Sequence, residues 1–118
     1  MAALSAVTSN LAMMIGEDRV FQDTIYQADG VTVQNISNWT ISFTVFRYDS
    51  PSTVLITKTT AGGGVVLTNP TQGVLQITVA AADTASLYPN QYEFVVQRTD
   101  SGNVLNLTRG VLSLLQVG

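Results

Sequence analysis

Apolar and polar residues alternate along several short segments of the chain, which is the pattern of β-strands with one buried face. The clearest segment is WTISFTVFRY, residues 39–48, in which Trp39, Ile41, Phe43 and Val45 share one face and threonine and serine take the other. Further strand-like segments, alternating or rich in β-branched side chains, are 19–27, 53–59, 65–68, 74–79, 91–98 and 104–117.

Turn-forming residues separate these segments about every dozen positions. Asp29-Gly30, Pro51 and the segment NPTQG at 69–73 are the plainest turn signals. One segment has helical character: residues 82–87 predict a single helical turn, because Asp83 favours the N-cap position. Seven to eight short strands with one helical turn predict an all-β fold, an immunoglobulin-like β-sandwich.

One domain accounts for most of the chain, because no linker or change of composition divides it. We expect the sandwich to span residues 15–118, with residues 1–14 forming either an N-terminal arm or the first strand. Gly110 lies in the middle of the last strand and predicts a β-bulge there.

The segment AGGGVVLTNPTQG at 61–73 holds four glycines, which raises the question of a phosphate-binding loop. Such a loop needs glycine-rich backbone that leads into a helix N-terminus, usually with a lysine and a serine or threonine. Here the glycines lead into the strand VVLT and no lysine follows them. The segment therefore predicts a flexible hairpin loop between strands.

Composition narrows the range of functions. Hydrophobic residues make up 46% of the 118 residues and charged residues only 11%, with a net charge of −3. The five basic residues are scattered, so we expect no nucleic-acid binding. There is no histidine and no cysteine, which removes the commonest general base and any thiolate. The N-terminal apolar run LAMMI is too short for a signal peptide or a membrane span, so no membrane association is expected.

Carboxylates are the remaining candidates for catalysis or metal binding. Asp29, Asp49 and Asp100 lie in turn segments, where aspartate bonds to local backbone, and Asp83 is interpreted as a helix cap. Only Glu17-Asp18 is an adjacent pair, and two oxygen donors do not form a calcium site. We therefore expect no catalytic residues, no metal and no cofactor.

Four aromatic residues invite a choice between core and surface. Trp39 and Tyr92 lie on alternating apolar faces and are expected in the core, with a sugar-stacking pair as the alternative. Phe46 and Tyr48 share the outward parity of Thr44, which suggests a contact between subunits. A bulge near Arg47 that reverses the register and buries Phe46 is the alternative.

Taken together, residues 15–112 resemble the immunoglobulin-like N-terminal domain of the baseplate upper protein family of tailed bacteriophages. The resemblance lies in IGEDRVFQDTIYQADG, in ISNWTISFTVFR, and most fully in the run of strands and turns from 55 to 114. The chain departs from the family pattern at three positions. Glu17 separates Gly16 from Asp18, and asparagine replaces the glycine of the family at positions 38 and 90. The resemblance places Asn90 in a left-handed conformation before Tyr92.

The resemblance implies a non-enzymatic structural component of a virion, in the tail, baseplate, head fibre or capsid decoration, made in the bacterial cytoplasm. Its partners would be other virion proteins, and the domain would stand alone as a connector. The uncharged first dozen residues suggest a symmetric homo-oligomer in which Leu4, Val7 and Leu11 pack on a neighbouring subunit. The alternative function is an immunoglobulin-like surface or secreted module that binds carbohydrate or protein.

Overall fold

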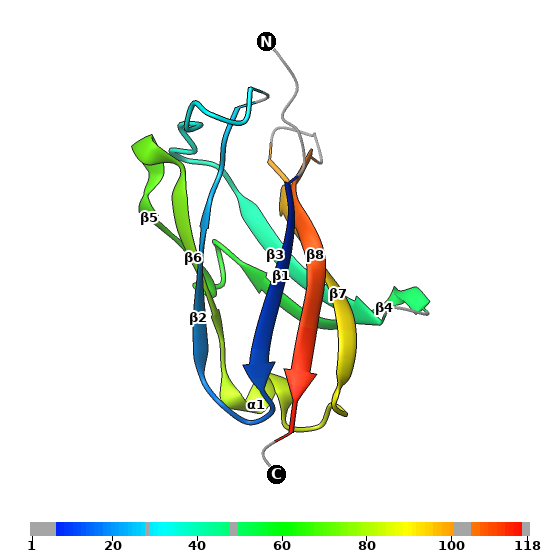
Figure 1. The fold of residues 1–118 in the computed structure, drawn as a ribbon. Coiled ribbons are helices and arrows are strands. Elements are labelled where there is room, and N and C mark those ends of the chain that lie inside the picture. The colour runs from blue at the N-terminus through cyan, green and yellow to red at the C-terminus, as the bar shows by residue number, and fades with distance from the viewer. Residues whose placement is uncertain (1–6, 28, 48–49, 101–104, 117–118) are drawn as a thin grey trace.

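The structure is a computed structural model, and it describes residues 7–27, 29–47, 50–100 and 105–116. Two β-sheets pack face to face in a body of 46 × 27 × 26 Å (Figure 1). One sheet has five strands in the order β1-β8-β7-β3-β4, and the other has three in the order β2-β6-β5. The strands are β1 (Val7–Met14), β2 (Arg19–Thr24), β3 (Ile41–Arg47), β4 (Ser50–Thr59), β5 (Val65–Asn69), β6 (Val74–Val79), β7 (Asn90–Arg98) and β8 (Leu105–Leu115).

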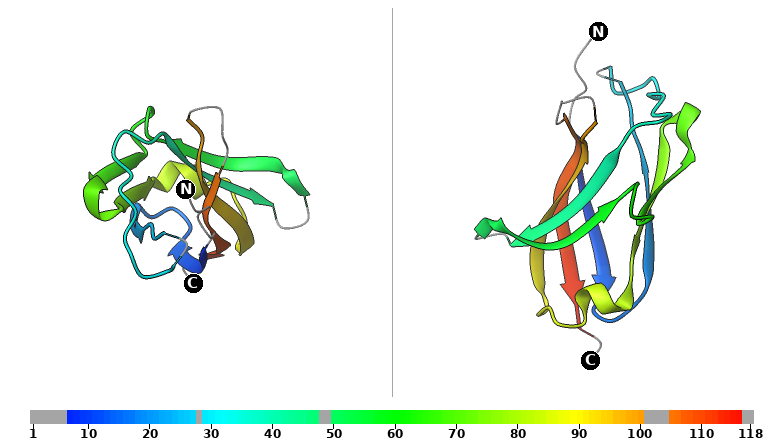
Figure 2. Two further views of the ribbon diagram at one scale, coloured as in Figure 1. Left: turned by 90° about the horizontal axis from the view of Figure 1, so that it is seen from above. Right: turned by 180° about the vertical axis from the view of Figure 1, so that it is seen from behind.

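This arrangement confirms the predicted fold, an all-β immunoglobulin-like sandwich. The view along the strands in Figure 2 shows β5 and β6 on one side of the molecule and β7 and β8 on the other. Near the start of β7 the Tyr92 hydroxyl donates a hydrogen bond of 2.8 Å to the Tyr88 carbonyl, four residues upstream. That bond has the form of the tyrosine corner of immunoglobulin-like domains. The single α-helical turn in the described residues, α1, spans Ala81–Thr84 and so begins slightly before the segment predicted.

The core lies between the sheets and follows the predicted alternation. Every second residue of β3 is buried from Ile41 to Val45, and the same holds in β7 from Tyr92 to Val96. The rings of Phe43 and Phe94 meet at the centre with centroids 5.6 Å apart. Aromatic and aliphatic burial of this kind is the main favourable contribution to folding.

The described part of the N-terminal segment belongs to the sandwich. Residues 7–14 form β1, which pairs in parallel with β8 of the same chain. Leu11 packs against the core, and Met13 is buried in it. Of the two alternatives for residues 1–14, the first strand is therefore what the described residues 7–14 adopt.

A short turn connects β1 to β2 and rests on α1. The Gly16 amide donates to the Thr84 hydroxyl over 2.9 Å, and the Ala81 amide donates to the Asp18 carboxylate over 2.7 Å. Gly16 has a φ of +83°, a conformation that glycine adopts without strain. These bonds tie both ends of α1 to the turn, so the two sheets are linked at this end of the sandwich.

The glycine-rich loop differs from the hairpin predicted. β4 and β5 belong to different sheets, so residues 60–64 cross from one sheet to the other instead of joining neighbouring strands. Gly63 has a φ of +84°, and a side chain at Gly64 would meet the Lys58 Cδ at 2.7 Å. No helix follows the glycines, since β5 begins at Val65. Gly63 therefore allows the backbone conformation of the turn, and Gly64 leaves room for the Lys58 side chain.

At the opposite end, the long connection from β2 to β3 rests on a 3₁₀ turn, η1 (Pro70–Gln72). The Ile25 amide donates to the Gly73 carbonyl, and the Ile36 amide to the Pro70 carbonyl, over 2.8 and 2.9 Å. Gly73 has a φ of +74°, and an added Cβ would lie only 2.5 Å from the Ile25 carbonyl oxygen. Glycine is therefore required at this position for two reasons, its backbone conformation and the close contact.

Two predictions about local backbone are wrong. The bulge of β8 lies at Leu107, where the pairing with β7 skips one residue, whereas Gly110 pairs regularly with Phe94. As a result Leu107 and Thr108, which are adjacent, are both buried. The left-handed asparagine is Asn38, with a φ of +66°; Asn90 is the first residue of β7 and is not left-handed. Strand pairing with Leu114 keeps Asn90 extended.

Candidate interaction surface

The outer face of the five-stranded sheet carries Phe46. β3 pairs with β7 without interruption from Ile41 to Arg47, so Phe46 keeps the outward parity of Ser42 and Thr44. The register does shift in the pairing of β3 with β4, but the additional residues fall on β4. The bulge of the alternative interpretation thus lies on the neighbouring strand, and it does not turn Phe46 toward the core.

Phe46 lies in a shallow groove of about 720 Å³ on this outer face. Val95 of β7 and Val111 of β8 supply the other outward apolar side chains of the groove. Polar and charged side chains lie among them. Glu93 pairs with Phe46 on one side and with Val111 on the other, and the groove lining also includes Gln97, Asn106 and Arg109. We call this set of residues the outer-face groove, to which β3 contributes Phe46 and β7 and β8 contribute the rest. Aromatic residues and arginine, both present in this groove, are enriched at protein–protein interfaces.

The other residues predicted at a subunit interface are distributed differently. Leu4 and Tyr48 lie outside the described residues, and for Val7 the structure gives the backbone, in β1. Leu11 points between the sheets, where it lines a small cavity of about 30 Å³. Among the described side chains predicted at an interface, only Phe46 faces outward.

Trp39 and Tyr92 do not form a pair. Tyr92 is buried, as expected, and pairs across the sheet with Arg47, whereas Trp39 precedes the opposite end of β3. Trp39 is only partly buried: it packs against the core, and the Arg98 guanidinium lies 4.1 Å from its ring centroid. One ring face is therefore covered by a cation–π contact, which leaves less of the ring for a sugar.

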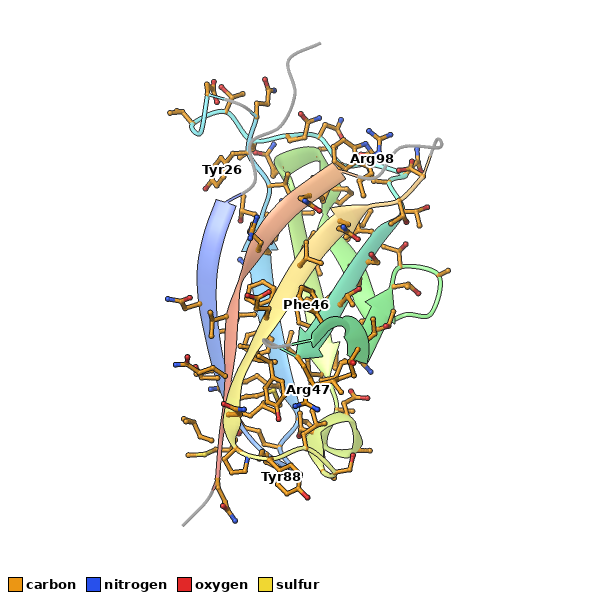
Figure 3. The ribbon with its side chains drawn as sticks, turned by 90° about the vertical axis from the view of Figure 1, so that its right-hand side faces the viewer. Tyr26, Phe46, Arg47, Tyr88 and Arg98 are labelled. Atoms are coloured by element: carbon orange, nitrogen blue, oxygen red, sulfur yellow. The ribbon has the colours of Figure 1, made fainter. Side chains whose placement is uncertain are left out.

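Arg98 in turn binds Asp100, with hydrogen bonds of 2.6 and 3.3 Å to the two carboxylate oxygens. These bonds lower the pKa of the Asp100 carboxyl from its ordinary value. Figure 3 shows Arg98 and Tyr88 at opposite ends of the molecule, with Phe46 between them. The Trp39, Arg98 and Asp100 cluster thus stabilises one end of the sandwich and lies away from Phe46.

Asp23 is a partly buried carboxylate that sequence reasoning did not select. The Thr108 hydroxyl, which the bulge at Leu107 turns inward, donates a 2.7 Å hydrogen bond to it from the facing sheet. Burial raises the pKa of Asp23 despite this bond. The sequence does contain a signal for this position. Phe21, Asp23 and Ile25 are two residues apart, so the Asp23 side chain shares the inward face of its two apolar neighbours.

Asp29 bonds locally, as its turn position suggested, whereas the prediction of Asp83 as the N-cap is wrong: Ala80 is the N-cap of α1, and Asp83 is the third residue of the helix. Asp29 accepts hydrogen bonds from the Val31 and Thr32 amides, and the Thr32 hydroxyl bond lowers its pKa. Asp83 accepts from the Ala80 amide and from Lys58, whose ammonium lies 2.7 Å away. Desolvation acts to raise the pKa of Asp83, but the Lys58 and Ala80 bonds leave it lowered.

The described residues offer neither a metal-binding cluster nor a membrane-spanning helix. No group of three or more histidine, cysteine, aspartate or glutamate side chains in that part of the chain is arranged to hold a metal ion. In the same residues, no helix has the length and apolar character to span a membrane.

Comparison with known proteins adds a fold neighbour. No family model matches the chain, and no curated protein matches it. Among solved structures, it is similar to the first immunoglobulin domain of mouse SynCAM 2, with 16% sequence identity and a TM-score of 0.39. That match covers 92% of this chain and 93% of the mouse domain. The sheet order and the tyrosine corner carry the fold assignment independently of this neighbour.

Proposed function

We propose that the chain is a non-enzymatic structural component of a tailed-bacteriophage virion that acts by protein–protein assembly. The proposal rests on one observation from the sequence and one from the structure. The virion context is supported by the sequence resemblance across residues 15–112 to the phage baseplate domain. The mode of action is supported by the outward position of Phe46 on the five-stranded sheet.

The outer-face groove is the surface that would bind another virion protein. Phe46, Val95 and Val111 give it apolar side chains on an outward sheet face, and such side chains favour contact with protein. Glu93 and Arg109 give the groove one charge of each sign, which would orient the partner. Aromatic residues are enriched at the energetic centres of interfaces, so Phe46 is the residue that should contribute most.

Incorporation into particles tests this proposal. A phage that encodes the chain is produced with either the native domain or Phe46→Ser, and banded particles are probed with an antibody to the domain. We expect the native chain in the particle band and Phe46→Ser absent from it, although the purified variant stays folded by circular dichroism. Val66→Ser is the matched control, because Val66 is 48% exposed on β5 of the other sheet.

Two results would count against the proposal. If the native protein is missing from banded particles and is recovered outside the cells, a surface or secreted binding module becomes the better explanation. If Phe46→Ser enters particles as well as Val66→Ser does, the outer-face groove is not the surface that joins the domain to the virion.

A further inference from the structure

The sandwich has four edge strands, and three of them carry features that discourage pairing with another sheet. These edges are β4 in the large sheet and β2 and β5 in the small one. β4 contains Pro51 and Lys58, and its pairing with β3 is irregular. β5 has only five residues and a register shift, while β2 carries Arg19 and the inward carboxylate of Asp23. Proline, short length, bulges and inward charges are the usual means of protecting an edge.

The fourth edge, β1, has none of these features. Its eight residues, VTSNLAMM, include no charged residue, no proline and no glycine. Its pairing with β8 is regular over the whole strand, from Val7 with Thr108 to Met14 with Leu115. An uncharged, regular edge strand of this length is a template for a further strand.

Hydrogen bonding shows which backbone groups of β1 face the open side. The Ile15 amide donates to the Leu115 carbonyl, so in this parallel ladder the odd-numbered residues bond to β8. The even-numbered residues direct their amides and carbonyls away from β8. At Met14 this outward position is occupied: its amide donates to the Glu17 carboxylate over 2.8 Å, and its carbonyl accepts from the Glu17 amide. Within the part of the chain that the structure describes, the backbone groups of β1 that remain open are those of Thr8, Asn10 and Ala12.

We propose that two copies of this chain pair through their β1 edges, antiparallel, about a two-fold axis at Asn10. Residues directly opposite each other in an antiparallel pair face the same side, and a hydrogen-bonded pair needs outward groups on both. A register centred on Asn10 satisfies both conditions, with Thr8 opposite Ala12 of the second copy. A register centred on Leu11 would need the outward groups of Met14, which Glu17 occupies.

The resulting assembly is one ten-stranded sheet with closed symmetry. The contact is the same on both copies, as a two-fold interface requires. The strand carries no charge, so the two copies meet without repulsion. The Asn10 side chain is exposed, and two such amides would meet at the axis and can bond to each other. This self-contact extends the assembly role proposed above and leaves the outer-face groove free for another protein.

Charge reversal at the axis tests the pairing in purified protein. Asn10→Lys places two ammonium groups opposite each other, and Asn10→Glu places two carboxylates. Each variant alone should dimerise at least about tenfold more weakly than the native chain in sedimentation equilibrium. An equimolar mixture of the two should recover the dimer. The control is Val66→Lys, on the protected edge strand β5, which should dimerise as the native chain does.

A second variant tests the backbone directly. Ala12→Pro removes an amide that faces the open side and leaves the ladder to β8 intact, so it should abolish dimers while the circular dichroism spectrum stays native. The proposed pairing is overturned if the native chain is monomeric at millimolar concentration. It is equally overturned if Asn10→Lys dimerises like Val66→Lys. Either result is independent of incorporation into particles, because the measurement uses purified protein.

Discussion

Gly73 offers the sharpest test of how the loop end of the sandwich is held together. An alanine there must adopt a φ near +74°, and its Cβ would lie 2.5 Å from the Ile25 carbonyl oxygen and 2.7 Å from that of Gln34. Both oxygens are backbone atoms, so relief requires the β2–β3 connection to move. That movement would strain the bond from the Gln34 amide to the Ile25 carbonyl and the bond from the Ile25 amide to the Gly73 carbonyl.

The expected cost has two parts. A left-handed conformation costs an L-residue roughly 1–2 kcal/mol. Weakening two hydrogen bonds adds about 1–3 kcal/mol, at 0.5–1.5 kcal/mol each. Gly73→Ala should therefore lose roughly 2–5 kcal/mol, a large share of the 5–15 kcal/mol typical of such a domain.

Gly63→Ala is the matched control. Gly63 has a similar φ of +84°, but an added Cβ there meets no atom within 4 Å. It should lose only the conformational part, roughly 1–2 kcal/mol. Urea unfolding, followed by circular dichroism and by the fluorescence of the single tryptophan, Trp39, measures both variants. Equal losses for the two alanines would refute the close contact at Gly73.

Three further predictions follow from single contacts. Tyr92→Phe removes the hydrogen bond to the Tyr88 carbonyl and should lower the free energy of unfolding by about 0.5–1.5 kcal/mol in urea denaturation; no change would show that the corner does not stabilise the fold. Asp23→Asn should gain stability relative to the native chain between about pH 3 and pH 7, judged from urea midpoints. Burial raises the pKa of Asp23 in the folded protein above its ordinary value of 3.8. The native chain is therefore stabilised by the protonated carboxyl below pH 3.8 and loses that contribution as the pH rises through the folded pKa, whereas asparagine does not titrate. Asn38→Gly should be neutral or stabilising while Asn38→Val loses about 1–2 kcal/mol in thermal melts, and equal melting temperatures would contradict the left-handed backbone.

Alternation along the chain was sufficient to predict the strands and the class of fold. It places Phe43 and Phe94 in the core because the side-chain period of a strand is two, and one buried face fixes the parity of every residue on it. The outward position of Phe46 follows from the same parity and holds because β3 itself contains no bulge.

The features that the sequence did not reveal depend on partners distant in the chain. Gly110 suggested a bulge at its own position. The bulge lies at Leu107 instead, because its position depends on which residues of β8 are buried opposite β7, and Leu107 and Thr108 are both buried. The left-handed conformation at Asn38 instead of Asn90 depends on strand pairing, which keeps Asn90 extended. The bond of Asp23 cannot be predicted from its neighbours in the sequence, because its partner, Thr108, comes from a strand near the other end of the chain.

The parallel pairing of β1 with β8 joins residues about 100 positions apart, so it governs the order in which the chain can fold. During synthesis, β1 leaves the ribosome before the other described strands and must wait for β8, the last of them in the chain. Until then β1 lacks its partner strand within the chain, and a chaperone or a neighbouring nascent chain could bind it. Completion of the five-stranded sheet is thus a late, long-range step, and its rate should be slow compared with the formation of the β7–β8 hairpin.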